Sequence, residues 1–182
     1  MAKVLVPLAR EFEDVEAITI IDVLRRGGME VVTAAVGDGL SVVGAHGVEV
    51  KADELLDDVV DDEYDAIVLP GGAGVDKLRV SERLIKRIVR QRADGRLLAA
   101  ICAAPLVLVD AGVLLDNYHA TCYPTCQLEL PCQWINQPVV EHEGIITGQA
   151  PGSAMLFALV VLQALMGEAT VRKVARGLVV DF

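Results

Sequence analysis

Cys102 is the residue of this sequence best placed for nucleophilic chemistry. It follows the apolar stretch RLLAAI, which is typical of a buried strand, and it precedes Pro105, which suits the first turn of a helix. At such a strand-to-helix turn, the free N–H groups and the helix dipole favour a negative sulfur. Because free cysteines are also among the most buried residue types, a packed core cysteine is an equal alternative on position alone.

Glu16 is a carboxyl group in an apolar setting. On a helical wheel of residues 13–26 it falls within the apolar arc, whereas Asp14 falls on the opposite, polar side. A carboxyl group on a buried arc is costly unless it is protonated or has a partner. Glu16 therefore either reaches solvent or caps the helix end, or it meets Cys102 and supplies acid–base chemistry.

The pair Gly71-Gly72 is the third candidate, and it follows Pro70 at the end of the apolar stretch YDAIVL. Glycines let backbone N–H groups approach a ligand closely, as an oxyanion site requires. A glycine pair alone is more often a simple tight turn. Its position relative to Cys102 and Glu16 decides between these two interpretations.

Strands and helices alternate along the chain, which predicts an α/β fold whose mostly parallel sheet is covered by helices on both faces. Ligands of such sheets bind outside the carboxyl ends of the strands, where the three candidates would meet. Apolar stretches predict strands at 3–8, 29–36, 64–69 and 96–101, a hairpin at 41–50 and two short strands within 138–149. Helices are predicted at 13–26, 82–93 with Ser81 as its cap, 105–112, 151–167 as a long buried helix, and 168–179, with 117–137 irregular.

Composition limits the class of protein. The chain has 182 residues, 53% of them hydrophobic, which fits one domain with a sizeable core. A formal net charge of −10 disfavours nucleic acid or an anionic membrane surface as the main partner. The longest apolar run, residues 97–109, is shorter than the roughly 18 residues that a membrane span needs. Because the N-terminus has no signal-peptide pattern, we expect a cytoplasmic protein whose cysteines are thiols.

Two further groups of residues are interpreted structurally. Three cysteines and a histidine fit no standard zinc-finger spacing, so no metal site is expected among Cys122, Cys126, Cys132 and His119. The basic residues of one predicted helix are expected to form a solvated face: Arg83, Lys86, Arg87, Arg90 and Arg92.

Five motifs occur in order across nearly the whole chain: FEDVEA, YDAIVLPGG, AAICAAP, ATCYP and QAPGSA. On these motifs the sequence resembles the ThiJ/PfpI superfamily, and within it the branch of the parkinsonism-associated deglycase and the bacterial chaperone YajL. The resemblance implies a flavodoxin-like three-layer sandwich, formed by one domain over residues 1–182, with a cysteine at a nucleophile elbow. It also implies a homodimer.

The resemblance assigns roles to individual residues. It implies that Cys102 is a nucleophile in a strained backbone conformation beside a protonated Glu16. Gly72 and Ala103 match positions whose backbone N–H groups face the site in that family. Pro151 matches a residue near the rim of the site.

The sequence departs from the family pattern at three positions. Ala103 stands where the proteolytic branch has a histidine, which argues against a Cys–His protease. Tyr123 stands where many members of the nearer branch have a histidine; it can donate a hydrogen bond to a substrate but cannot act as a base near neutral pH. His46 replaces an arginine near the dimer contact of the deglycase, which puts anion binding at that rim in doubt.

These residues predict carbonyl chemistry. A Cys102 thiolate would attack an aldehyde to form a hemithioacetal, whose oxyanion is held by N–H groups of the Gly71-Gly72 turn and the Ala103 region. Glu16 would move protons between oxygen and carbon, which converts a 2-oxoaldehyde such as methylglyoxal into a 2-hydroxy acid without a metal or nicotinamide. A glycated amine or thiol would be attacked by the same groups. The alternative is an oxidative-stress sensor or redox-regulated chaperone that uses oxidation of Cys102.

Overall fold

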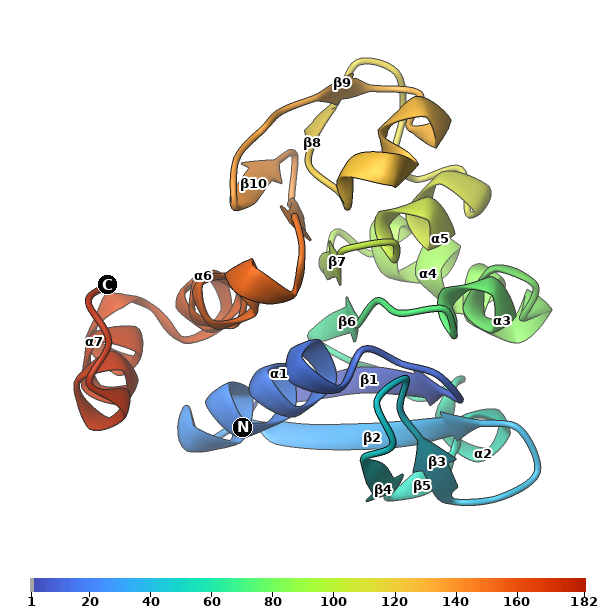
Figure 1. Ribbon diagram of the computed structural model, residues 1–182, viewed down its shortest axis with the longest axis horizontal. Coiled ribbons are helices and arrows are strands. Elements are labelled where there is room, and N and C mark those ends of the chain that lie inside the picture. The colour runs from blue at the N-terminus through green and yellow to red at the C-terminus, as the bar shows by residue number, and fades with distance from the viewer. Residues whose placement is uncertain (1) are drawn as a thin grey trace.

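A seven-stranded sheet forms the centre of the computed structural model, which describes residues 2–182 (Figure 1). The strands lie in the order β10-β11-β7-β6-β1-β2-β5, and every neighbouring pair is parallel except β10 with β11. Their bounds are β1 (Lys3–Ala9), β2 (Glu30–Val36), β5 (Glu54–Leu55), β6 (Ala66–Leu69), β7 (Leu97–Ile101), β10 (Val139–His142) and β11 (Ile145–Gly148).

Helices cover both faces of the sheet, as the sequence predicts (Figure 1). One face is covered by α1 (Asp14–Arg26) and α6 (Ala154–Met166), with α7 (Glu168–Leu178) packed against α6. The other face is covered by α2 (Leu56–Val59), α3 (Val75–Arg79), α4 (Glu82–Ala93) and α5 (Pro105–Asp110). Within residues 2–182, none of these helices has the length and apolar character needed to cross a membrane.

The central strands are apolar because both of their faces are buried. In β1, Val4, Val6 and Leu8 belong to the hydrophobic cluster under α1 and α6. Leu5 and Ala9, which alternate with them, belong to the cluster on the opposite face. The absence of polar alternation in such strands is typical of a parallel sheet covered on both sides, and the predicted α/β class is confirmed.

Short elements complete the chain. β3 (Ser41–Val43) and β4 (Glu49–Lys51) form the predicted hairpin. Segment 117–137, expected to be irregular, contains the parallel pair β8 (His119–Ala120) and β9 (Gln133–Trp134) and the 3-10 helix η1 (Pro124–Glu129). A second 3-10 helix, η2 (Pro151–Ser153), precedes α6. The sequence pattern does not predict β5, α2 or α3, because elements of so few residues show no detectable period.

Three expectations about helices are corrected. Arg87 is 4% exposed and does not join a solvated face, because its guanidinium donates to the Asp62 carbonyl at 3.1 Å and to the Gln91 side chain at 2.7 Å. Helix α6 is not buried throughout, since Leu156 is 39% exposed. Ser81 occupies the N-cap position of α4, but its side chain makes no capping hydrogen bond.

The strand order determines where a ligand would bind. β1, β6 and β7 are neighbours in the middle of the sheet, and their carboxyl ends share one edge. From β1 the chain crosses to β2 on one side, and it later returns to β6 on the other, so this edge contains the topological switch point at which such sheets bind ligands. The segments that follow these three strands carry Glu16, the Gly71-Gly72 turn and Cys102.

Candidate active site

Cys102 follows β7 directly and has a left-handed backbone conformation, with φ of 63°. This conformation is strained for a residue with a side chain and needs support from its surroundings. The Cys102 N–H donates to the Gly148 carbonyl at 3.0 Å, and the Cys102 carbonyl accepts from the Tyr123 N–H at 2.8 Å. Hydrogen bonds on both sides therefore hold the strained backbone of Cys102, and the residue is 8% exposed.

Glu16 is fully buried in the first turn of α1, as its place on the apolar arc predicts. Its Oε2 accepts the Gly71 N–H at 2.8 Å, whereas Oε1 has no hydrogen-bond partner within residues 2–182. A Cβ added to Gly71 would lie 2.7 Å from this Oε2 and 3.1 Å from the Cys102 Sγ. The carboxyl group and the sulfur therefore converge on Gly71, and Glu16 neither reaches solvent nor caps its helix.

Burial is the main influence on both ionisable groups. Burial raises the pKa of Glu16 to about 7, and the hydrogen bond from Gly71 opposes this shift. Burial, followed by the charge of Glu16, raises the pKa of Cys102 to about 12, while the backbone N–H groups of Gly72 and Ala103 act in the opposite direction. Because the charge of each group disfavours the charge of the other, the two groups titrate as a coupled pair that can share a proton.

The donors that favour a negative sulfur are backbone N–H groups of two turns and not the first turn of a helix. Helix α5 has only six residues and begins at Pro105, so Cys102 lies outside its first turn. The N–H groups that lower the pKa of the Cys102 thiol belong to Gly72 and Ala103. Since the Gly71 N–H is bound to Glu16, Gly72 and Ala103 are the better candidates for an oxyanion site.

Two predicted substrate-binding residues lie on segments that are hydrogen-bonded to the Cys102 backbone. Tyr123, whose N–H binds the Cys102 carbonyl, has a side chain that is accessible to a ligand, with the residue 42% exposed. Pro151 opens η2 shortly after Gly148, whose carbonyl accepts the Cys102 N–H. Both residues therefore lie on segments whose backbone is hydrogen-bonded to Cys102.

Acidic residues of the first turn of α1 are more buried than the sequence predicts. Asp14 is 6% exposed, although the helical wheel places it on the polar side. Its carboxylate accepts the backbone N–H groups of His46 and Val48, each at 2.9 Å, from the β3–β4 loop. Burial alone would raise the pKa of Asp14, but these hydrogen bonds lower it. A helical wheel shows only the residues of the helix itself, so it could not predict that a loop distant in sequence buries Asp14.

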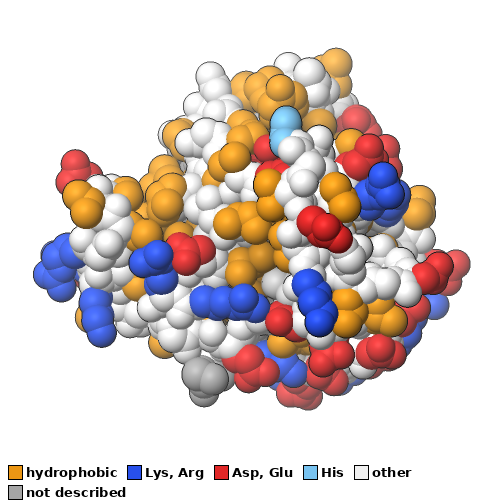
Figure 2. Space-filling view, turned by 60° about the horizontal axis from the view of Figure 1, so that its bottom comes forward, with side chains coloured by type: hydrophobic (Ala, Val, Ile, Leu, Met, Phe, Trp, Pro, Cys, Tyr) orange, Lys and Arg blue, Asp and Glu red, His pale blue; other side chains and the backbone are white. Residues whose placement is uncertain are grey.

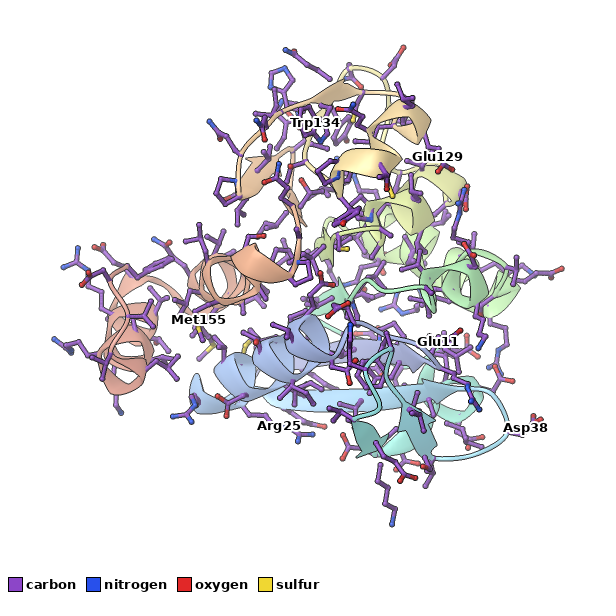
Figure 3. The ribbon with its side chains drawn as sticks, in the orientation of Figure 1. Glu11, Arg25, Asp38, Glu129, Trp134 and Met155 are labelled. Atoms are coloured by element: carbon purple, nitrogen blue, oxygen red, sulfur yellow. The ribbon has the colours of Figure 1, made fainter. Side chains whose placement is uncertain are left out.

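The segment 117–137 lies at the far side of the molecule from Arg25, as the positions of Trp134 and Arg25 in Figure 3 show. Trp134 packs against the hydrophobic cluster beneath α4 and α5, and its Nε1–H donates to the Cys122 carbonyl at 3.5 Å. In the part of the chain that the structure describes, no three His, Cys, Asp or Glu side chains group as potential metal ligands. The cysteines of this segment are free thiols.

Comparison with known sequences places these features in one family. The model of the DJ-1/PfpI family matches residues 2–164. Protein DJ-1 homolog B of Arabidopsis thaliana is 41% identical over 91% of this chain and 39% of its own length. The chain spans about two fifths of the length of the two Arabidopsis relatives it matches. Deglycase PfpI of Pyrococcus furiosus is 35% identical over 82% of this chain and 91% of its own. The glutathione-independent glyoxalase DJR-1.2 of Caenorhabditis elegans is 32% identical over 91% of this chain and 89% of its own length.

Solved structures agree over the whole fold. The structure of Toxoplasma gondii DJ-1, described as oxidized, has a TM-score of 0.94 and 37% identity, and the match covers 100% of both chains. Drosophila melanogaster DJ-1beta has a TM-score of 0.94 and 35% identity, and covers 100% of this chain and 99% of its own. These values confirm the predicted flavodoxin-like fold.

Proposed function

The chain belongs to the DJ-1/PfpI family, and from this premise we propose that it detoxifies reactive carbonyl compounds through Cys102, with Glu16 as the proton carrier. The convergence of the Cys102 sulfur and the buried Glu16 carboxyl group on Gly71 carries the proposal. The names of two relatives, a deglycase and a glutathione-independent glyoxalase, support the same substrate class. The proposed reaction uses no metal and no nicotinamide.

The shared proton lies on Glu16 in the reactive form, so the sulfur is a thiolate. An ionised Glu16 would carry its charge in a fully buried position, which is costly, whereas a protonated Glu16 can donate to the sulfur. Protonation also removes the negative charge that, after burial, contributes most to raising the pKa of Cys102. The N–H groups of Gly72 and Ala103 then stabilise the thiolate.

Turnover of methylglyoxal proceeds through covalent intermediates. The thiolate forms a C–S bond to the aldehyde carbon, and the aldehyde oxygen takes the proton from Glu16, which gives a hemithioacetal. Glu16 removes the hydrogen of that carbon as a proton and returns it to the adjacent ketone carbon. The hydroxyl proton of the hemithioacetal passes to the former ketone oxygen in the same rearrangement, which leaves a lactate thioester. Water hydrolyses the thioester to lactate and frees the sulfur. The aldehyde carbon is oxidised and the ketone carbon is reduced, so no external oxidant or reductant is consumed.

Glycated groups would enter the same route. In an adduct of methylglyoxal with an amine or thiol, the former aldehyde carbon carries both a hydroxyl group and the amine or thiol. Cys102 would attack this carbon and release the amine or thiol, which leaves with a proton from Glu16. The product is the same hemithioacetal, and the later steps are unchanged.

The purified protein should convert methylglyoxal to lactate without glutathione and in the presence of a metal chelator. Proton NMR of the reaction would follow the loss of methylglyoxal and the appearance of lactate together. Protein whose thiols are alkylated beforehand provides the control for uncatalysed conversion. Consumption without lactate, or no consumption above that control, would contradict the proposal.

Gly71→Ala should reduce kcat/KM for methylglyoxal by about a hundredfold, since a misplacement of roughly 1 Å has an effect of that order. The added Cβ would lie 2.6 Å from the Cys102 Cβ and 2.7 Å from the Glu16 Oε2, so the reacting groups must move apart. Gly177→Ala in α7 is the matched control, because a Cβ there meets no atom within 4 Å. Equal activity of the two variants would contradict the assigned geometry.

Redox sensing is the second candidate function. It is favoured by one observation on a relative, namely that the Toxoplasma protein was solved in a form described as oxidized. A carboxylic acid at Glu16 could also hydrogen-bond an oxygen added to the Cys102 sulfur. Redox sensing becomes the preferred function if two results are obtained together. Methylglyoxal is not consumed, and peroxide modifies Cys102 before Cys122, Cys126 and Cys132.

A homodimer belongs to the proposal as well. Hydrophobic side chains gather across the middle of one face of the molecule, with acidic side chains along its lower edge (Figure 2). Large exposed hydrophobic residues include Val15 and Ile18 of α1, at 54% and 42%, and Val48 of the β3–β4 hairpin, at 44%. Exposed apolar surface of this kind is typical of protein contact surfaces and supports the dimer that the family resemblance implies.

A further inference from the structure

The 3-10 helix η1 lies on the surface beside the candidate site, and none of its six residues is buried. Its start is attached to Cys102, because the N–H of Tyr123, which precedes η1, donates to the Cys102 carbonyl at 2.8 Å. Within the segment, the Cys126 N–H donates back to the Tyr123 carbonyl at 2.8 Å, which links the position of Tyr123 to that of η1. A segment that buries no side chain opens easily unless other contacts hold it.

Glu129, the last residue of η1, forms an ion pair with Arg79 of α3. The Arg79 Nη1 donates to the Glu129 Oε2 at 3.3 Å. In Figure 3, Glu129 lies on the side of the 117–137 segment that is nearer to α5. Within residues 2–182, this contact is the only side-chain hydrogen bond or ion pair that joins η1 to another helix or strand. The polar anchoring of η1 therefore depends on Arg79.

Arg79 is itself held in place by Asp110 of α5. The Arg79 Nε donates to the Asp110 Oδ2 at 2.6 Å, and Nη2 donates to Oδ1 at 3.3 Å. Such a two-pronged contact fixes the plane of the guanidinium, and both side chains are partly buried, at 27% and 33% exposure. Because Asp110 already orders Arg79, the contact with Glu129 does not have to order a free arginine side chain. A network of this kind holds its members better than an isolated surface ion pair does.

Three short elements begin near the candidate site and end at this cluster of ion pairs. Helix α3 follows the glycine turn and ends at Arg79, α5 follows Cys102 and ends at Asp110, and η1 follows Tyr123 and ends at Glu129. Helices α3 and α5 also bury side chains in the same hydrophobic cluster and pack against each other. Since η1 buries none, it is the element of the three that depends most on the ion pairs.

We propose that Arg79 is a positioning residue for Tyr123: its guanidinium, held by Asp110, fixes η1 through Glu129 and so keeps the Tyr123 side chain at the candidate site. The proposal rests on the function proposed above and on the predicted hydrogen bond from Tyr123 to the substrate. It predicts that loss of the Glu129 contact lets η1 and Tyr123 move together. Substrate binding then weakens, while the chemistry at the sulfur is unchanged.

Glu129→Ala should raise KM for methylglyoxal by about twofold to fivefold, the range expected for one partly exposed ion pair, with kcat nearly unchanged. Arg79→Gln, which removes the whole anchor, should raise KM at least as much. Glu129→Gln should lie between Glu129→Ala and the wild type, because its amide oxygen can still accept from Arg79. The matched control is Glu168→Ala, which removes an exposed ion pair with Arg172 on α7 and should match the wild type.

A double-mutant cycle tests whether the effect passes through Tyr123. Tyr123→Phe lacks the hydroxyl group that would donate to the substrate, so adding Glu129→Ala to it should raise KM no further. Effects of the two substitutions that add independently would overturn the proposal. A loss of kcat at unchanged KM in Glu129→Ala would overturn it too, because the reacting groups and not Tyr123 would then have moved.

The rate of Cys126 alkylation by iodoacetamide, followed by peptide mass spectrometry, reports the anchoring of η1 without carbonyl turnover. Cys126 is a partly buried free thiol within η1, and its rate should rise by about twofold to fivefold in Glu129→Ala. The Cys102 rate, read from the same digest, should stay at the wild-type value. Equal Cys126 rates in Glu129→Ala and Glu168→Ala would overturn the proposal. A wild type that makes no lactate would refute the proposed function, and the Cys126 rates would still decide whether Arg79 holds η1.

Discussion

Cys102→Ser should lower the rate of lactate formation from methylglyoxal by about a thousandfold or more while the fold is kept. Serine keeps the Cβ and nearly the size of cysteine, so it can occupy the same turn with φ of 63° and the same backbone hydrogen bonds. A hydroxyl group remains protonated where a thiol can be ionised, and Glu16 is an acid in the proposed reactive form, so it cannot activate the oxygen. The rate would be measured by NMR under saturating methylglyoxal.

The control for this experiment is Cys132→Ser. Cys132 is a partly buried thiol of the 117–137 segment, and its substitution makes the same chemical change outside the site. Circular dichroism and the thermal unfolding midpoint of both variants would establish that the fold is retained. A Cys102→Ser variant that turns over methylglyoxal at the rate of the Cys132→Ser variant would remove Cys102 from the mechanism.

Glu16→Gln should stabilise the protein above pH 7, by as much as about 3 kcal/mol. Burial raises the pKa of Glu16 from its ordinary value of 4.5 to about 7, so the folded state binds the proton more tightly than the unfolded state. The stability that this proton provides is complete below pH 4.5 and is lost as the pH rises through 7. Glutamine stays neutral at every pH and avoids this loss, so its advantage should shrink towards pH 4.5.

Urea unfolding of wild type and Glu16→Gln at about pH 5 and pH 8.5 would measure this difference. Glu141→Gln, on the exposed side of β10, makes the same charge change without burial and should show no comparable pH-dependent gain. The same Glu16→Gln variant should lose activity, because its amide cannot carry the proton. A gain in stability together with a loss of turnover would separate the folding cost of Glu16 from its chemical role. Stability that fell at pH 8.5 would contradict the assigned burial effect.

The architecture could be predicted because its signals are local. The strands β1, β6 and β7 are apolar without alternation, and α1 and α4 show clear helical periods that end at glycines. Arg87 marks the limit of this reasoning. A basic residue on a charged helix is expected in solvent, but the carbonyl of Asp62 and the side chain of Gln91, which become neighbours only in the folded chain, bury its guanidinium.

The same limit applies within the candidate site. Glu16 could be identified because a carboxyl group on an apolar arc is anomalous, and Cys102 because it ends a buried strand. Nothing on the helical wheel identifies Asp14, since the β3–β4 loop that covers it lies some thirty residues later in the chain. A Cβ on Gly44 of that loop would lie 2.6 Å from the Asp14 carboxyl carbon. The contact therefore requires a glycine at position 44, and this glycine is the one sign of it in the sequence.

Because β1, β6 and β7 are neighbours in the sheet but far apart in the sequence, the candidate site forms late in folding. The acid, the glycine turn and the sulfur are contributed by segments at residues 16, 71–72 and 102, and they meet only when the three strands have paired in register. Until then Cys102 is an ordinary thiol, without the Glu16 proton or the Gly72 amide beside it. The reactivity that we propose for Cys102 therefore depends on the pairing of these strands, and a chain in which they have not paired would lack it.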